Sequence, residues 1–133
     1  MSRRDLVSSL GGAVTLAPAA RTAAATGTAV DLNGYEMAAV LLISGTITDG
    51  TGYVWEIQHS DDNSTWTAVP DDELVGAEPT FGAADDNAVR KIGYRGRRRY
   101  LRASIASVTG SPSTGGVLGA VVLRAGARVA PVS

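Results

Sequence analysis

The segment His59–Val69 (HSDDNSTWTAV) gathers several side chains that could do chemistry. Within it, Asp61–Ser64 places two carboxylates beside an amide and a hydroxyl, and such oxygens are the ligands that Ca²⁺ prefers. The segment Ala84–Asn87 (ADDN) repeats this chemistry, so the two loops could share an ion if they meet in space. Both lack the ligand spacing of an EF-hand. Because Asp and Asn stabilise turns through local hydrogen bonds, solvated turns between strands are the simpler interpretation.

Trp55 and Trp66 suggest a second chemistry, because indole rings can stack on a sugar ring. The segment between them, SDDNSTW, resembles the Asp-box hairpin S-x-D-x-G-x-T-W, although Ser64 stands in place of its glycine and one residue is missing. An Asp box is usually a structural turn. In a chain with only 5% aromatic residues, tryptophans are more often anchors of the core.

The inventory of side chains argues against catalysis. His59-Ser60-Asp61 holds the residue types of a hydrolase triad, but neighbours on one strand point to opposite faces and cannot form a relay. The chain has no cysteine and a single histidine, which removes thiol nucleophiles and zinc-thiolate sites and leaves too few imidazoles for zinc. No glycine pattern fits a phosphate-binding loop. We therefore predict no enzymatic activity, no catalytic residues, no metal and no cofactor.

The charges are sharply divided along the chain. Residues 22–89 hold twelve Asp and Glu and no Lys or Arg, whereas residues 90–133 hold nine Lys and Arg and no Asp or Glu. The first 21 residues add three Arg and one Asp, and the formal net charge is −1. Such a split is typical of nucleic-acid binding, or of complementary faces that meet within one molecule or between copies.

Arg90–Arg102 (RKIGYRGRRRYLR) concentrates seven basic residues and two tyrosines in thirteen positions. Cations interleaved with aromatic rings would suit phosphate contacts and base stacking. The twelve acidic residues of the same small domain oppose that field, however. We therefore favour a basic rim that pairs with an acidic surface, and we do not expect nucleic acid as a partner.

From residue 28 onward the pattern predicts strands joined by turns. Residues 37–47 form an apolar, β-favouring run typical of a buried central strand, and Tyr53–His59 alternates with period two. Turn signals at 48–52 (TDGTG), 95–98 (RGRR) and 109–116 separate further short strands. We predict an all-β fold, a single antiparallel β-sandwich or small barrel of about seven strands that follow one another by hairpins. No apolar run approaches the roughly 20 residues of a membrane span, so no membrane partner is expected.

Residues 1–27 are predicted to form an extended N-terminal arm outside the β-sandwich domain of residues 28–133, which ends in a short C-terminal tail from residue 124. Ala, Thr, Ser and Gly dominate the arm, and Pro18 would break a helix. So few large apolar groups cannot offset the entropy of ordering, and we expect the arm to order only on a partner and to lie outside the β core.

The chain resembles a group of small virion proteins encoded in the structural cassettes of tailed phages and prophages. The resemblance covers nearly the whole chain and rests on four motifs in order: G-T-I-T-D-G at 45–50, S-D-D-N-S-T-W at 60–66, A-D-D-N at 84–87 and G-Y-x-G-x-x-R-Y-L-R at 93–102. It implies a structural protein of the phage head, a decoration (cement) protein that stabilises the capsid from its outer surface and occurs in the host cytoplasm during assembly. The implied partners are the major capsid protein and neighbouring copies of the chain, a trimer being one arrangement.

Two other functions stay open at this stage: a virion module that binds host glycans through Trp55, Trp66 and Asp61–Ser64, and a head–tail connector or tail component. For the decoration protein, charge and apolar content in the arm and the basic rim suggest the contact residues. The side chains expected to contact the capsid or a neighbouring copy are Arg3, Arg4, Leu6, Leu10, Arg21, Arg97, Arg98, Arg99 and Arg102.

Overall fold

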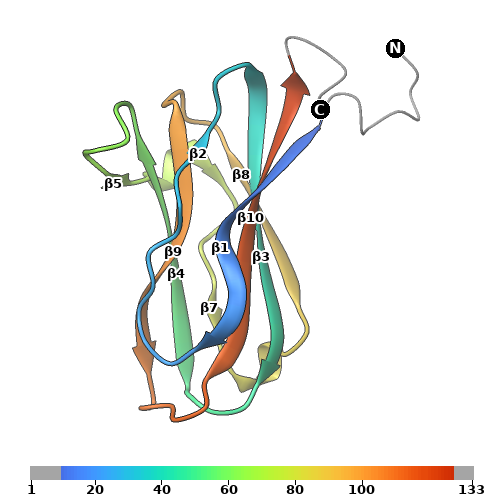
Figure 1. Cartoon of the computed structure of the whole chain (residues 1–133), viewed down its shortest axis with the longest axis vertical. Coiled ribbons are helices and arrows are strands. Elements are labelled where there is room, and N and C mark those ends of the chain that lie inside the picture. The colour runs from blue at the N-terminus through green and yellow to red at the C-terminus, as the bar shows by residue number, and fades with distance from the viewer. Residues whose placement is uncertain (1–9, 128–133) are drawn as a thin grey trace.

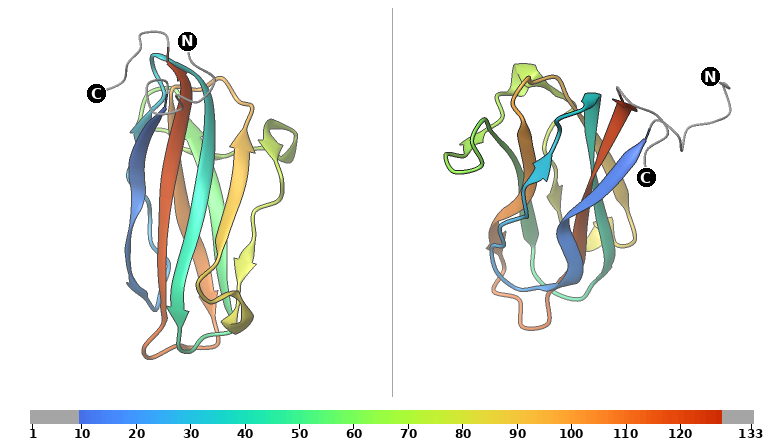
Figure 2. Two further views of the ribbon diagram at one scale, coloured as in Figure 1. Left: turned by 90° about the vertical axis from the view of Figure 1, so that its right-hand side faces the viewer. Right: turned by 45° about the horizontal axis from the view of Figure 1, so that its top comes forward.

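The computed structural model describes residues 10–127, which form two facing antiparallel sheets, and Figures 1 and 2 show the two layers. The fold is the predicted all-β sandwich. The described residues contain ten strands where about seven were expected, because four of them are only two residues long. They are β1 (Gly11–Arg21), β2 (Val30–Asp31), β3 (Tyr35–Ile47), β4 (Gly52–Ser60), β5 (Thr67–Ala68), β6 (Leu74–Val75), β7 (Thr80–Phe81), β8 (Val89–Tyr94), β9 (Tyr100–Thr109) and β10 (Gly116–Ala127).

The first sheet has the strand order β1-β10-β3-β8-β6, and the second has the order β2-β9-β4-β5, with β7 also paired to β4. The long strands β3 and β10 pair over most of their length, from Tyr35 opposite Ala127 to Ile47 opposite Gly116. In the second sheet β4 pairs with β9 from Gly52 to Ser60. The core lies between the sheets and is built by alternation, since inward-facing residues are two apart on each strand. Its fully buried members include Val40, Leu42, Trp55, Ile57, Phe81, Leu101, Leu118 and Val122.

The predicted hairpins are mostly wrong, although the antiparallel pairing is right. The segments at 48–52, 95–98 and 109–116 each carry the chain from one sheet to the other, so β3 and β4, β8 and β9, and β9 and β10 do not pair. A local turn signal cannot distinguish a hairpin from such a crossing, because both reverse the chain. In the described chain, β4 and β5 are joined by residues 61–66 and do pair with each other, as predicted for strands that follow one another.

The predicted arm is also wrong over most of its described length. Strand β1 pairs with β10 along the edge of the first sheet, and Leu16 is buried in the core. The buried hydroxyl of Thr15 donates to the carbonyl of Thr28 at 2.7 Å and accepts from the amide of Ala103 at 3.2 Å, which joins the two sheets. Pro18 fits because the register shifts twice beside it on an edge strand. Residues 1–9 lie outside the described residues.

Two further segments depart from the prediction. The connection between β5 and β8 holds two short strands beyond the predicted number, β6 and β7, together with 3₁₀ turns at Asp71–Glu73 and Ala83–Asp85. The last strand was expected to end at residue 123, but β10 continues to Ala127. Arg124, assigned to the tail, lies within that strand and stacks over the ring of Tyr35 at 4.7 Å.

Candidate functional site

The turn at residues 61–66 is held by its own carboxylate, as the sequence predicts for an Asx turn. The Asp62 carboxylate accepts hydrogen bonds from the amides of Ser64 and Thr65 and from the hydroxyl of Ser60, each at 2.9 Å. These bonds, chiefly those from Thr65 and Ser64, lower the pKa of Asp62 to about 2. Asn63 takes the left-handed conformation with φ of 61°. Oδ1 of Asp62 is thus committed to the turn.

The second Asp-Asp-Asn loop is also structural and lies at the opposite end of the sandwich (Figure 1). Asp85 accepts from the amide of Gly82 at 2.8 Å, and Asp86 accepts from the amide of Ile47 at 3.3 Å. The hypothesis that the two loops share an ion is therefore wrong, because the length of β4 separates them. In residues 10–127 no group of three or more His, Asp or Glu side chains is arranged to hold a metal ion.

The triad-like residues point in different directions. His59 is buried, and its Nδ1 lies 2.8 Å from the hydroxyl of Tyr94. The Tyr94 oxygen also accepts from the amide of Arg98, so its own proton is available to Nδ1, which suits a neutral imidazole. Burial also lowers the pKa of His59, which favours the same neutral form of the ring. Ser60 bonds to its own turn instead, and Asp61 forms an ion pair with Arg98 at 3.3 Å.

The two tryptophans do not form one platform. Trp55 is buried in the core, with its ring edge-on to Phe81 at 6.0 Å. Trp66 lies on the outer side of the second sheet, where the guanidinium of Arg102 stacks over its ring at 4.1 Å. The proposed sugar-stacking pair is therefore absent, and the outward ring is already covered by a cation.

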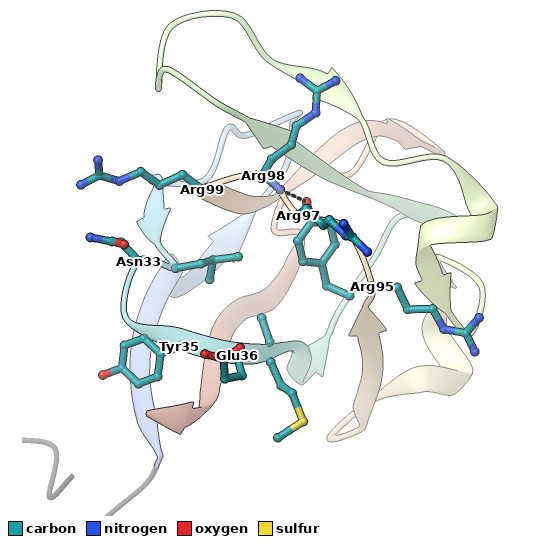
Figure 3. Close-up of a pocket in the computed structure, with 12 residues that line it drawn as sticks. Asn33, Tyr35, Glu36, Arg95, Arg97, Arg98 and Arg99 are labelled. Carbon is teal, nitrogen blue, oxygen red and sulfur yellow. Dashed lines mark hydrogen bonds between the residues drawn. The ribbon is translucent and has the colours of Figure 1, made fainter. Parts of the chain in front are cut away.

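An open groove of about 530 Å³ lies at one end of the sandwich, where the β8–β9 loop faces the β2–β3 turn (Figure 3). The buried ring of Tyr94 lines it, and Gly96 has to be glycine because a Cβ there would collide with that ring. Four guanidinium groups extend from the loop in different directions, as Figure 3 shows. The lining residues are Leu32, Asn33, Tyr35, Glu36, Met37, Ala38 and Tyr94 to Arg99.

The four arginines of this loop fall into two pairs. Arg98 pairs with Asp61, and Arg99 makes a two-pronged contact with Asp31 through Nε at 2.9 Å and Nη2 at 2.8 Å. The hydrogen bonds from Arg99 lower the pKa of Asp31. Arg95 and Arg97 are exposed and have no ion-pair partner among residues 10–127. The two unpaired guanidinium groups beside the groove are the available binding groups of this end.

The predicted contact residues are only partly brought together. Arg97, Arg98 and Arg99 share the groove, whereas Arg102 lies on the outer side of the second sheet and donates to Gln58 at 2.8 Å. Arg21 lies at the other end of β1, where it donates to the carbonyl of Ala17 at 2.6 Å. Leu10 is half-buried at the start of the described chain. Arg3, Arg4 and Leu6 lie outside the described residues.

Arg95 is a candidate binding residue that the sequence prediction missed. Its neighbours in the basic run have the same charge and spacing, and the difference between them comes from Asp31 and Asp61, which are distant in sequence. Tyr35 and Met37 also line the groove and were not predicted to do so; Met37 was expected at the start of a buried strand. The one available signal was the turn NGYE at residues 33–36, which brings an aromatic ring to the end of a strand.

Comparisons with known proteins add no family to this description. No family model matches the chain, and no curated protein matches it significantly. Within the described range of residues, no helix is long and apolar enough to cross a membrane. The fold and the arginine-rich end are therefore the features from which a function is inferred.

Proposed function

We propose that this chain is a structural protein of a phage virion, a decoration (cement) protein that binds the outer surface of the capsid through its arginine-rich end. The observation that carries the proposal is the pair of guanidinium groups of Arg95 and Arg97, which lie beside an open groove and have no ion-pair partner in residues 10–127. The capsid is proposed as the partner because the order of the four motifs resembles that of phage virion proteins.

The residues of those motifs mostly maintain the fold and leave the arginine-rich end as the free surface. Asp49 of the first motif bonds to the amides of Ser113, Thr114 and Gly115, and Asp62 of the second holds its own turn. Only the fourth motif, at residues 93–102, contributes the groove and its cations. The surface at this end is therefore dominated by arginine side chains.

The groove suits an acidic loop of a capsid subunit. Arginine binds carboxylates through paired hydrogen bonds, and both Arg95 and Arg97 line the groove. The contact is small, so each copy binds weakly. A lattice that presents many equivalent sites then retains the protein through avidity if neighbouring copies are linked.

The test mixes the purified full-length protein with undecorated capsids and measures co-sedimentation over a range of protein and salt concentrations. We expect saturable binding that weakens as salt rises, because the contact is electrostatic. The double variant Arg95→Gln/Arg97→Gln should weaken binding about tenfold, which corresponds to about 1.4 kcal/mol.

The control is Arg21→Gln/Arg90→Gln, which removes the same charge from positions away from the groove and should bind like the wild type. An absence of saturable binding at moderate salt would contradict the proposed function. Equal weakening in both double variants would show that net charge, and not the groove, governs attachment.

A further inference from the structure

The exposed large apolar side chains of residues 10–127 are all on one surface. Five large hydrophobic residues are exposed in residues 10–127, with exposed fractions from 38% to 61%. Each belongs to the first sheet and alternates with inward-facing residues, so each points away from the core. They are Val14 on β1, Met37 on β3, Val75 on β6, Val89 on β8 and Val117 on β10.

Half-buried apolar residues connect these five into a continuous face. On the same side of the sheet, Val14 stands opposite Val121, and Val121 stands opposite Leu41. In the neighbouring row Ile43 stands opposite Val89. We call this surface the apolar face: the outward residues of β1, β10, β3, β8 and β6.

The apolar face is also nearly uncharged. Within the described part of these strands, alternation places one charged side chain on it, Lys91 on β8, which stands opposite Leu41. Small residues lie between the large ones, and neighbouring large side chains already cover two of them: a Cβ at Gly45 would meet Val117, and one at Gly93 would meet Val75. The face is therefore largely covered by apolar side chains, which suits the packing of one sheet on another about 10 Å away.

We propose that the apolar face binds the apolar face of a second copy of this chain and forms a two-fold symmetric dimer. The single surface can pair with itself because it is apolar on both copies: with the two-fold axis parallel to the strands, Leu41 of one copy meets Val121 of the other. A surface that pairs with itself closes after two subunits, whereas a trimer would need two different patches. This inference concerns contacts between copies and does not depend on the proposed function.

The charge on the face is compatible with this pairing. With the two-fold axis parallel to the strands, β8 of one copy lies over β1 of the other, so the two Lys91 side chains are kept apart. Each ammonium group can then extend past Val14 toward solvent along its aliphatic stem. Pairing through the sheet edge is disfavoured at β1, where Pro18 and two register shifts interrupt the ladder.

The available area is sufficient for a specific but moderate interface. Strands lie about 4.8 Å apart and rise about 3.3 Å per residue, so four strands paired over about eight residues present roughly 500 Å². Two such faces bury roughly 1,000 Å², which is near the lower limit for a specific complex. We therefore expect a dissociation constant in the range of about 1 to 100 μM.

The test is sedimentation equilibrium of the full-length protein from about 1 to 300 μM, with Val121→Lys as the main variant. The wild type should pass from monomer to dimer over this range, and the variant should stay monomeric, with at least about a tenfold weaker association. Val14→Lys/Val89→Lys gives the same test at more exposed positions, in case Val121→Lys fails to fold. Val54→Lys makes the matched change on the outer side of the second sheet and should still dimerise.

Three outcomes overturn the proposal. One is a wild-type monomer at all concentrations, which would leave the face to a different protein. Another is a dimer that persists in both folded Lys variants of the face. The third is an equal loss of dimer in Val54→Lys, which would show that added charge alone prevents association.

Discussion

The outer sides of the two sheets differ in how their side chains are satisfied. On the second sheet a polar ladder crosses the strands: Gln58 donates to Glu56 at 2.9 Å, Arg102 donates to Gln58 at 2.8 Å, and the Arg102 guanidinium covers Trp66. The outer side of the first sheet is the apolar face, with one lysine and rows of Val, Leu and Ile. The outer side of the second sheet is therefore suited to contact with water, whereas the outer side of the first sheet is not.

This difference shows that the fold alone does not determine the outer surfaces. Both sheets bury the same kind of inward residue, since Leu42 and Ile57 are fully buried on opposite sides of one core. The outward residues contribute little to that core and can follow other requirements. An exposed apolar face of roughly 500 Å² is comparable to the largest patch of a typical monomer, and patches of that size often have a binding role.

The sharpest test of this comparison uses two adjacent leucines of β3. Leu42 points into the core and is fully buried, whereas Leu41 points outward and is partly exposed. Leu42→Ala should lower the free energy of unfolding by about 3 kcal/mol through lost burial and a cavity, and Leu41→Ala by about 1 kcal/mol or less. Urea denaturation at low protein concentration measures both. Similar losses would mean that the two sides of the sheet are not distinguished by burial.

Acid should affect the fold and the apolar face differently. Hydrogen bonds from Gly115, Thr114 and Ser113 lower the pKa of Asp49 to about 2, and Asp62 is lowered to the same value. A carboxyl whose pKa is lower in the folded state adds stability above its unfolded value of about 4 and loses it as the pH falls toward 2. Thermal stability should therefore fall in that window.

Asp49→Asn should flatten this acid limb of the stability curve, and Asp72→Asn, on the exposed 3₁₀ turn, is its control. Association through the apolar face has no carboxyl group to titrate, so the dissociation constant should change little between pH 7 and pH 5. Thermal midpoints across pH and sedimentation at the two pH values check both statements. A dimer that dissociates between pH 7 and pH 5 would argue for an interface other than the apolar face.

The smallest expected effect concerns the polar ladder. Arg102→Ala removes the contact with Trp66 and the hydrogen bond to Gln58, each of which is partly exposed to solvent. We expect a loss of about 1 kcal/mol in the free energy of unfolding, with dimerisation unchanged. Denaturation and sedimentation of the same samples measure the two quantities. Loss of the dimer in Arg102→Ala would contradict the proposed dimer, because it would place the interface on the outer side of the second sheet.

The sequence predicts the parts of the fold that depend on local chemistry. Alternation over Tyr53–His59 correctly predicts a strand with one buried side, and Asp62 and Asn63 correctly predict the turn that follows. These features need only neighbours in sequence. The order of strands in the two sheets depends on long-range packing, so the turn signals at 48–52 and 95–98 were misread as hairpins.

Other features could not be read from the pattern for physical reasons. Strand β1 is held by backbone pairing and by the small buried residue Thr15, so a measure of large apolar content misses it. Arg95 differs from Arg99 only because Asp31 lies beside the latter in space. The run at residues 37–47 looks buried on both sides, and only the sandwich shows that its outward half, including Leu41, has no cover in the described chain.

The copy number of this chain in purified particles, relative to the major capsid protein, tests the proposed role most directly. A decoration protein occupies equivalent sites over the whole shell, so mass spectrometry with labelled standards should find it in a fixed ratio close to that of the capsid subunits. The proposed lattice avidity requires that abundance, because it depends on many copies bound at equivalent sites. A count limited to the few copies of a single ring would contradict the account and assign the chain to a connector or tail component.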